Sequence, residues 1–254
     1  YERAKSGEFD AVVAVGGDGT INEVLQGVCK AKEDKCNTPS FGILYTGTSP
    51  DICKFHGIPL AMSDAVRLIA ENSTKFTDIG EVEHDGKVAW FLCSVNLGMG
   101  AKIASASNSG LRKYLGDFIG TLVSMLKAVF TSTLSDFKCE IDGSKETLTR
   151  CLNITIGKNP LIASGIKIDE DITPDDGRMY LFSVQNMGPF SMMRYIPSIY
   201  LGTFHKNRKN GFRFLKEFEC LKNEVAPDVE YDGDPKGMLP CKIRLRERYL
   251  RIIK

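Results

Sequence analysis

The sequence lacks a long hydrophobic run and has no excess of charge of either sign. Its most apolar long stretch, residues 118–130, is interrupted by Lys127 and is shorter than the roughly 20 residues that a membrane-spanning helix needs. The 33 lysines and arginines balance the 32 aspartates and glutamates to leave a formal net charge of +1, so no overall positive field recruits nucleic acid. We therefore expect a soluble, cytoplasmic protein whose partners do not include nucleic acid.

Several common chemical signatures are also absent. The eight cysteines are scattered with no CxxC pair, and several lie in apolar segments, which is typical of reduced thiols. The three histidines are not spaced as a metal site, and the single Trp90 offers no stacking platform. The sequence contains neither the GxSxG motif of serine hydrolases nor the GxxxxGK[ST] loop of Walker-type NTPases. We therefore expect neither a disulfide scaffold nor a member of these two enzyme classes.

What the sequence does contain is a strand, a glycine-rich turn and a helix start in immediate succession. Residues 11–15 are apolar and rich in valine, which is typical of a strand covered on both faces of a parallel sheet. Three glycines follow within four positions, and residues 21–29 are an expected helix that Asp18 or Thr20 can cap. Because glycine lets a ligand approach the backbone, a phosphate would meet free N–H groups at the positive end of this helix. We predict a phosphate-binding loop; the alternative is a purely structural turn.

The same pattern recurs further along the chain. Residues 41–45 are a second short apolar strand, a Gly/Thr/Asp loop occupies residues 46–51, and residues 59–72 have the periodicity of a helix. Two strands that each lead through such a loop into a helix place both loops at the carboxyl edge of a parallel sheet. This edge is where α/β folds bind their ligands.

Three aspartates, Asp18, Asp51 and Asp78, each lie at or just after the end of an expected strand. In one sheet they can converge on the same edge, and Mg²⁺ is commonly held by one or two carboxylates together with waters and phosphate oxygens. We predict that these aspartates bind Mg²⁺ beside the phosphate loop. Each of them, taken alone, could instead be a helix cap or a turn residue.

From residues 76–80 onward the pattern changes, because alternating segments are joined by tight turns and no longer by helices. Asp85-Gly86 and Asp142-Gly143 each separate two such segments and predict antiparallel hairpins. The pattern predicts an α/β domain over residues 1–80, a mainly β domain over residues 81–240, and a C-terminal strand, residues 241–254, that can return to the first domain. Further expected strands are residues 152–156, 179–184, 213–220 and 243–253, and expected helices are residues 110–131 and 189–201.

The expected helix at residues 189–201 carries methionines, and a basic segment, residues 205–209, follows it. This combination suits acyl chains near an anionic membrane surface, so transient peripheral contact with a membrane is one interpretation. The other interpretation is a solvated basic turn, which is the more common meaning of a short run of charge. The apolar stripe of residues 110–131 is expected to face the core.

Four segments carry a resemblance to a known family. They are VGGDGTINEV at residues 15–24, GTSPD at residues 47–51, TDIG at residues 77–80 and VEYDGD at residues 229–234. Asn96, Gly98 and Gly100, and the stretch from residue 157 to residue 177, extend the match nearly end to end. The chain is thus similar to the diacylglycerol kinase catalytic family of bacterial soluble lipid kinases, which also includes sphingosine and ceramide kinases.

The resemblance implies an α/β nucleotide-binding domain, a β-sandwich-like lipid domain and an active cleft between them. It implies ATP- and Mg²⁺-dependent transfer of the γ-phosphoryl group to the hydroxyl of a lipid such as diacylglycerol, near the inner membrane surface, and it is compatible with a homodimer. Asp232 would accept the hydroxyl proton, with Asp234 and Asp18 as the other catalytic residues. The implied nucleotide-binding residues are Gly16, Gly17, Asp18, Gly19, Thr20, Ile21, Asn22, Thr48 and Asp51.

The resemblance also implies two metal sites. Asp18, Asp51 and Asp78 would hold the catalytic Mg²⁺, directly or through water. A second, structural ion would lie in the loop that ends at residue 178, with Asp176 as its main ligand. The further implied ligands of this second ion are Asp175 and the carbonyl groups of Thr173 and Arg178.

The chain departs from the family pattern in three places. The family's opening strand with its Asn-Pro-x-Ser-Gly loop is absent, Ser49-Pro50 replaces Gly-Asn in the second loop, and Asp234 replaces a glutamate. Two alternatives therefore stay open. One is an NAD kinase, which shares the Gly-Gly-Asp-Gly-Thr loop, and the other is a catalytically inactive lipid-binding or regulatory protein. The lipid kinase ranks first because Asn22-Glu23-Val24, the Asp176 loop and Asp232-Gly233-Asp234 follow its pattern.

Overall fold

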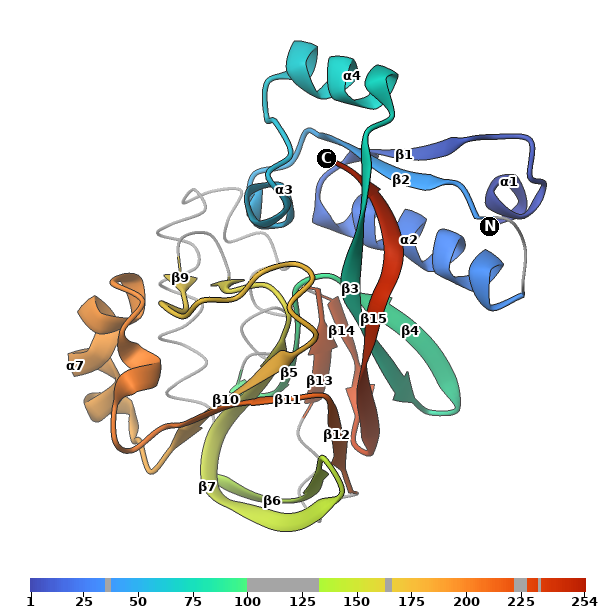
Figure 1. Ribbon diagram of the computed structural model, residues 1–254. Helices are drawn as coiled ribbons and strands as arrows, with labels where there is room; N and C mark the ends of the chain where they lie inside the picture. The colour runs from blue at the N-terminus through green and yellow to red at the C-terminus, as the bar shows by residue number, and fades with distance from the viewer. Residues whose placement is uncertain (35–37, 100–132, 163–165, 222–227, 233) are drawn as a thin grey trace.

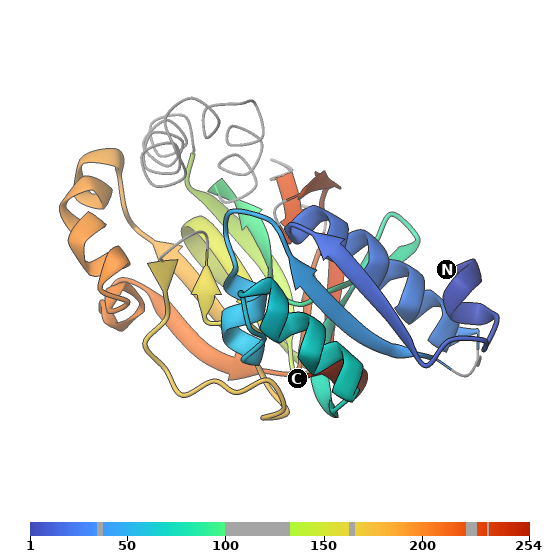
Figure 2. The ribbon, with the colours of Figure 1, turned by 90° about the horizontal axis from the view of Figure 1, so that it is seen from above.

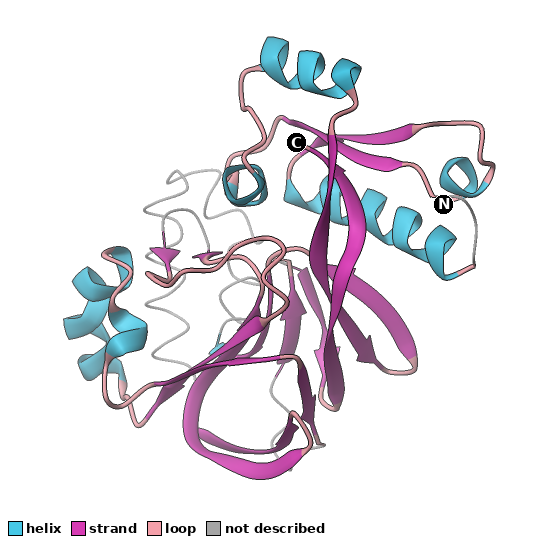
Figure 3. Cartoon of the chain, in the orientation of Figure 1, coloured by secondary structure: helices cyan, strands magenta, loops and turns pink. Residues whose placement is uncertain are grey.

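The structure, a computed structural model, describes residues 1–34, 38–99, 133–162, 166–221, 228–232 and 234–254. In this part of the chain two lobes share one 13-stranded sheet, whose main path runs β1-β2-β15-β12-β6-β7-β5-β13-β14. Helices gather in the first lobe and at α7, and strands dominate the second lobe (Figure 3). This arrangement confirms the expected α/β lobe followed by a β-sandwich-like lobe.

The first lobe places a parallel pair of strands between helices. Strands β1 and β2 pair in parallel register from Ala11 opposite Ser40 to Gly16 opposite Tyr45. Helix α2 lies on one face of this pair and α4 on the other (Figures 1 and 2). The elements of this lobe are α1 (Glu2–Lys5), β1 (Ala11–Gly16), α2 (Asp18–Glu33), β2 (Ser40–Tyr45), α3 (Asp51–His56) and α4 (Met62–Glu71).

The second lobe is built from antiparallel strands around a separate apolar core, which includes Phe137, Ile156 and Phe218. Its strands are β3 (Thr74–His84), β4 (Lys87–Phe91), β5 (Ser94–Gly98), β6 (Ser135–Ile141), β7 (Ser144–Gly157), β10 (Met179–Gln185), β11 (Gly211–Leu215), β12 (Glu217–Cys220), β13 (Asp228–Tyr231), β14 (Asp234–Met238) and β15 (Cys241–Ile253). A small two-stranded sheet of β8 (Leu161–Ile162) and β9 (Ile166–Lys167), helix α7 (Pro189–Tyr200) and the 3₁₀ turn η2 (Phe204–Lys206) complete it.

Strands β3 and β15 run through both lobes as one long antiparallel pair (Figure 1). Ile79 of β3 and Ile252 of β15 belong to the apolar core of the first lobe. Val82 and Ile243, further along the same two strands, belong to the core of the second lobe. The two lobes are therefore joined by a continuous ladder rather than by a single linker.

The structure confirms most of the expected elements. Asp85-Gly86 and Asp142-Gly143 form the two hairpin turns with positive φ at all four residues, as a type I′ turn requires. The expected strand at residues 213–220 is instead two strands, β11 and β12, which pair with different neighbours. The helix expected at residues 59–72 begins only at Met62, and the short helix α3 before it was not expected. The helix expected at residues 110–131 lies outside the described residues.

Two findings bear on the composition of the chain. In the described ranges, no helix is both long enough and apolar enough to cross a membrane. The seven cysteines that can be described are all free thiols, as their scatter predicted.

Candidate active site

Two glycine loops of the first lobe touch each other. Gly16 and Gly17 end β1, Gly47 follows β2, and the N–H of Thr46 donates to the carbonyl of Gly16 at 3.0 Å. A Cβ atom on Gly47 would lie 2.7 Å from the Cα of Gly17, which is too close for any side chain. The absence of side chains is thus what lets the two loops meet at one edge of the sheet, as predicted.

Helix α2 begins directly at this contact. Its N-cap is Gly17, with no side-chain hydrogen bond to the first turn, and Asp18 is the first helical residue. The expectation that Asp18 or Thr20 caps the helix is therefore wrong, since Thr20 lies inside the helix and packs against Gly16. The first-turn N–H groups face the loop without a side-chain cap, which suits a phosphate.

The charges of carboxylates from both lobes act on Cys93, which lies just before β5. Burial raises the pKa of the Cys93 thiol well above its ordinary value, and the negative charges of Asp232, Asp18 and Asp51 raise it further. Asp51 also accepts a hydrogen bond from the Ser49 hydroxyl at 3.0 Å, on its Oδ2. The junction between the lobes is thus acidic, which is the setting in which a divalent cation neutralises phosphate and carboxylate together.

Asp232 is held by donors from both lobes. It lies in the turn after β13, in the left-handed region with a φ of 48°. Its Oδ2 accepts from the side-chain amide of Asn22 on α2 at 2.9 Å and from the N–H of Leu92 at 3.0 Å. Its Oδ1 accepts from the N–H groups of Cys93 at 2.9 Å and Ser94 at 3.3 Å.

These four donors take up the four lone-pair positions of the Asp232 carboxylate. Burial raises the pKa of Asp232 above its usual range, although the hydrogen bonds from Leu92, Cys93 and Asn22 oppose this effect. In this arrangement the carboxylate has no lone pair left for a substrate hydroxyl. It is placed to fix Asn22 and the start of β5 relative to each other.

A buried polar row continues from this point across the second lobe. Asn96 on β5 donates to Glu230 on β13 at 2.8 Å, and the hydroxyl of Thr155 on β7 donates to Asn96 at 2.6 Å. These residues are opposite one another in the strand register, so they line one face of three adjacent strands. The side-chain amide of Asn153, two residues before Thr155 on β7, donates to the side-chain oxygens of Asn96 and Thr155. Sequence reasoning singled out Asn96 of this row and included Glu230 in the segment VEYDGD, but it missed Thr155 and Asn153.

The expected position of Asp78 at a strand end is wrong, and its binding of the catalytic Mg²⁺ stays a prediction. Asp78 lies in the middle of β3, not at a strand end, and its carboxylate accepts from the N–H groups of Gly177 and Arg248, each at 2.8 Å. It is also 3.2 Å from the ammonium group of Lys158. Among the residues that the structure describes, no three histidine, cysteine, aspartate or glutamate side chains are arranged to hold a metal ion.

The predicted ligands of the second ion do come together, but around a lysine. Lys158 donates to the carbonyls of Thr173 at 2.8 Å and Arg178 at 3.1 Å and to the carboxylate of Asp176. Asp175 is exposed and lies beside the Thr173 hydroxyl, and its role as a ligand stays a prediction. Sequence reasoning did not assign a role to Lys158. A lysine that directly follows a run of buried strand residues was the feature that could have indicated a buried, paired ammonium group.

The remaining predicted residues are placed less tightly. Thr48 is exposed in the second loop, and Asp234 begins β14 opposite Tyr231, with its side chain outside the described part of the structure.

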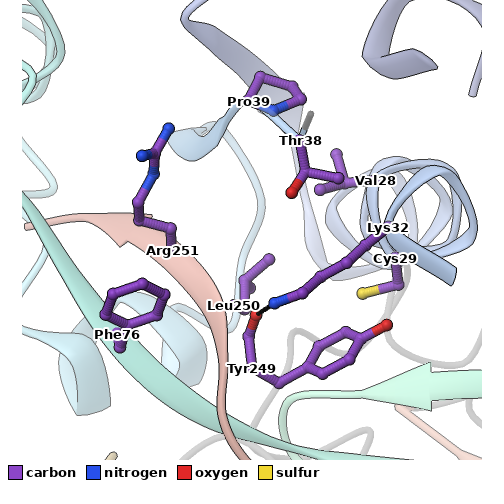
Figure 4. A pocket seen from close by; sticks show the side chains of 9 residues that line it. All are labelled: Val28, Cys29, Lys32, Thr38, Pro39, Phe76, Tyr249, Leu250 and Arg251. Carbon is purple, nitrogen blue, oxygen red and sulfur yellow. Dashed lines mark hydrogen bonds between the residues drawn. The ribbon is translucent and has the colours of Figure 1, made fainter. Parts of the chain in front are cut away.

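A cavity of about 230 Å³ lies elsewhere, where α2 faces β3 and β15 (Figure 4), and contains none of the predicted site residues. Its lining is Val28, Cys29, Lys32, Thr38, Pro39, Phe76, Tyr249, Leu250 and Arg251.

Comparisons with known proteins agree with this two-lobe arrangement. A family model described as a diacylglycerol kinase catalytic domain matches residues 1–82, and one described as a YegS C-terminal NAD kinase beta sandwich-like domain matches residues 93–254. Diacylglycerol kinases of Staphylococcus haemolyticus and Staphylococcus aureus are 25% and 26% identical to the chain, over 99% of its length and 73% and 76% of theirs.

Solved structures share the fold. A diacylglycerol kinase structure from Bacillus anthracis strain Sterne has a TM-score of 0.70 at 20% identity, and the match covers 99% of this chain and 79% of that one. Yeast NADH kinase in complex with NADH has a TM-score of 0.51 at 12% identity, with 96% of this chain and 60% of that one covered. At these identities the likeness concerns the fold alone.

The hydrogen bonds of Asp232 predict a large effect of removing one of its oxygens. In Asp232→Asn the amide NH₂ faces two N–H donors whichever way it is turned, so we expect the free energy of unfolding to fall by about 2 kcal/mol. Urea unfolding measures this difference. Asp85→Asn is the matched control, because Asp85 has nearly the same φ of 49° and its side chain is 69% exposed. Equal urea midpoints for the two variants would contradict the structural role of Asp232.

Proposed function

Since the chain belongs to the family that joins a diacylglycerol kinase catalytic domain to a YegS-like C-terminal domain, we propose that it is a lipid kinase. It would transfer the γ-phosphoryl group of ATP to the hydroxyl group of a lipid such as diacylglycerol. The observation that carries this proposal is the meeting of two side-chain-free glycine loops with carboxylates from both lobes at one junction.

The first lobe would hold the nucleotide. The contact between Gly17 and Gly47 leaves a cradle that a Cβ atom would fill, and the uncapped start of α2 supplies N–H groups for phosphate. The phosphates would lie along residues 16–20 and Thr48. Asn22 would link the two lobes and not bind phosphate, because its side-chain amide donates to Asp232 across the lobe junction.

Asp18 and Asp51 are the residues that would hold Mg²⁺ with the phosphates. The residues present fit such an ion, because the charges of both carboxylates act on the same residue, Cys93, and Mg²⁺ takes its other ligands from water and phosphate. When bound, the ion would neutralise the charge that develops on the transferred group.

The second lobe would present the lipid hydroxyl. The buried row of Glu230, Asn96 and Thr155 begins next to Asp232 and offers both donors and acceptors to a polar headgroup. We assign proton acceptance to Asp234 rather than to Asp232, because all four lone-pair positions of Asp232 are occupied. Asp234 begins the strand on the other side of the same turn.

Peripheral contact with an anionic membrane surface is part of the proposal. Arg208 and Lys209, after α7, are exposed, whereas Lys206 is paired with Asp169 at 3.0 Å. Met192 of α7 is buried in an apolar cluster with Ile199 and Phe204, so it contributes to the core of the lobe and not to a lipid-facing surface.

The proposal predicts phosphorylation of a lipid. The chain is incubated with γ-labelled ATP and Mg²⁺ and, in parallel, with diacylglycerol micelles, sphingosine micelles or NAD, and the products are resolved by mass. We expect label in a lipid and none in NAD. Label in NAD alone would establish an NAD kinase instead. ATP binding without turnover on any lipid would favour a regulatory lipid-binding protein.

The glycine cradle predicts a specific defect in nucleotide binding. In Gly47→Ala the new Cβ lies 2.7 Å from Gly17, so the loops must separate, and we expect the KM for ATP to rise about tenfold. Steady-state kinetics at saturating lipid give this value. Gly188→Ala is the control, since a Cβ there meets no atom within 4 Å. An unchanged KM for ATP in Gly47→Ala would remove the loops from the nucleotide site.

The assignment of the proton acceptor predicts that two neighbouring aspartates behave differently. Asp234→Asn should lower kcat about 100-fold with an unchanged urea midpoint, because it removes a general base. Asp232→Asn should lower the urea midpoint. If instead Asp234→Asn keeps full kcat, Asp234 is not the base and the assignment is wrong.

A further inference from the structure

The ammonium group of Lys158 occupies the centre of an oxygen cage. Four oxygens surround its Nζ: the carbonyls of Thr173 and Arg178 at 2.8 and 3.1 Å, a carboxylate oxygen of Asp176, and the Oδ2 of Asp78 at 3.2 Å. The Lys158 side chain is only 1% exposed. Two carboxylates and two backbone carbonyls are the kind of ligand set that hard cations such as Ca²⁺ and Mg²⁺ take in proteins.

The cage is electrically balanced without a further ion. The negative charges of Asp78 and Asp176 are matched by Lys158 and by Arg178, whose Nε donates to Asp176 at 3.1 Å. Burial raises the pKa of Asp176, but the hydrogen bonds from Lys158 and Arg178 lower it below its usual range, which favours the charged, paired form of this carboxylate. A buried charge that lacks such partners would be costly.

A divalent ion does not fit these residues. Mg²⁺ needs oxygens at about 2.0–2.1 Å in a near-octahedral arrangement, and the ammonium nitrogen already lies where such an ion would bind. A second cation beside Lys158 would also be repelled at short range in a medium of low dielectric. The structural ion that the family resemblance implies at Thr173, Asp176 and Arg178 therefore disagrees with this chain.

We propose that Lys158 replaces that divalent ion, so that its ammonium group is a built-in cation that fixes the loop of residues 173–178. The inference does not depend on the kinase activity. It concerns the stability of the lobe junction and the ions that this stability requires.

The built-in cation joins segments that lie far apart in the chain. Lys158 directly follows β7, and Asp78 belongs to β3, the strand shared by both lobes. Asp78 in turn accepts from Gly177 in the loop and from Arg248 on β15, and its own N–H donates to the carbonyl of Pro174 at 2.9 Å. One ammonium group thus ties the loop to the two strands that connect the lobes.

The first test uses the unmodified chain without nucleotide. Its thermal midpoint should be the same in EDTA as in Mg²⁺ or Ca²⁺, because the cage needs no divalent ion. The variant Asp176→Asn removes one carboxylate of the cage. It therefore shows whether any effect of EDTA on the midpoint arises at the cage or at another ion site. If EDTA lowers the midpoint of the unmodified chain and Asp176→Asn abolishes that sensitivity, a metal occupies the cage and the proposal is overturned.

The second test empties the cage. Lys158→Ala should have a lower midpoint in EDTA and recover part of the loss in Mg²⁺ or Ca²⁺, and it should bind one more Mn²⁺ than the unmodified chain by electron paramagnetic resonance. Lys158→Met fills the space without charge and should show the loss with no recovery. Lys206→Ala, at an exposed lysine that is paired with Asp169, is the control and should respond to neither. No added Mn²⁺ and no recovery in Lys158→Ala would show that the oxygens are not a cation site.

Discussion

The arrangement of this molecule depends on the long antiparallel pairing of β3 with β15. From Thr74 opposite Ile253 to His84 opposite Cys241, the two strands pass from the core of the first lobe into the core of the second. Because the ladder is shared, the edge of β1 and β2 that carries the glycine loops is fixed relative to the hairpin of β13 and β14. A site made from both lobes needs this fixed relation, since hydrogen bonds such as that from Asn22 to Asp232 tolerate little displacement.

The junction treats its carboxylates in two different ways. Around Lys158, Asp78 and Asp176 are fully paired with cations and backbone N–H groups of the chain itself, so that part is electrically complete. Around Cys93, the charges of Asp232, Asp18 and Asp51 raise the pKa of a half-buried thiol, so negative charge from both lobes acts at this place. We propose that a metal-bound nucleotide binds at the second place, and that Lys158 takes the place of a cation at the first. The junction thus contains a structural group of charges around Lys158 and a second group around Cys93, where the proposed reaction would take place.

Local sequence patterns were sufficient to predict the parts of the fold that depend on neighbours in the chain. The valine-rich strand before Gly16, the turns at Asp85-Gly86 and Asp142-Gly143, and helix α7 follow from periodicity and turn chemistry. The role of Asp78 could not be predicted in this way, because β3 continues six residues beyond it and its partners are 80 to 170 residues away. Asp232 is similar, with donors 138 to 210 residues away. Such contacts are set by tertiary packing, and no spacing in the sequence encodes them.

The structure shows what Ser49-Pro50, one of the departures from the family pattern, does in the second loop. The Ser49 hydroxyl donates to the Asp51 carboxylate, and Pro50 is the N-cap of α3 with its φ held near −79°. The backbone that precedes Asp51 is thus stiffened, and one of its carboxylate oxygens is oriented before any ligand arrives. An amide side chain at position 50 would add a hydrogen-bonding group but would lose this restraint. The second loop has therefore exchanged a ligand contact for a more rigid placement of Asp51, the residue proposed to hold Mg²⁺ with the phosphates.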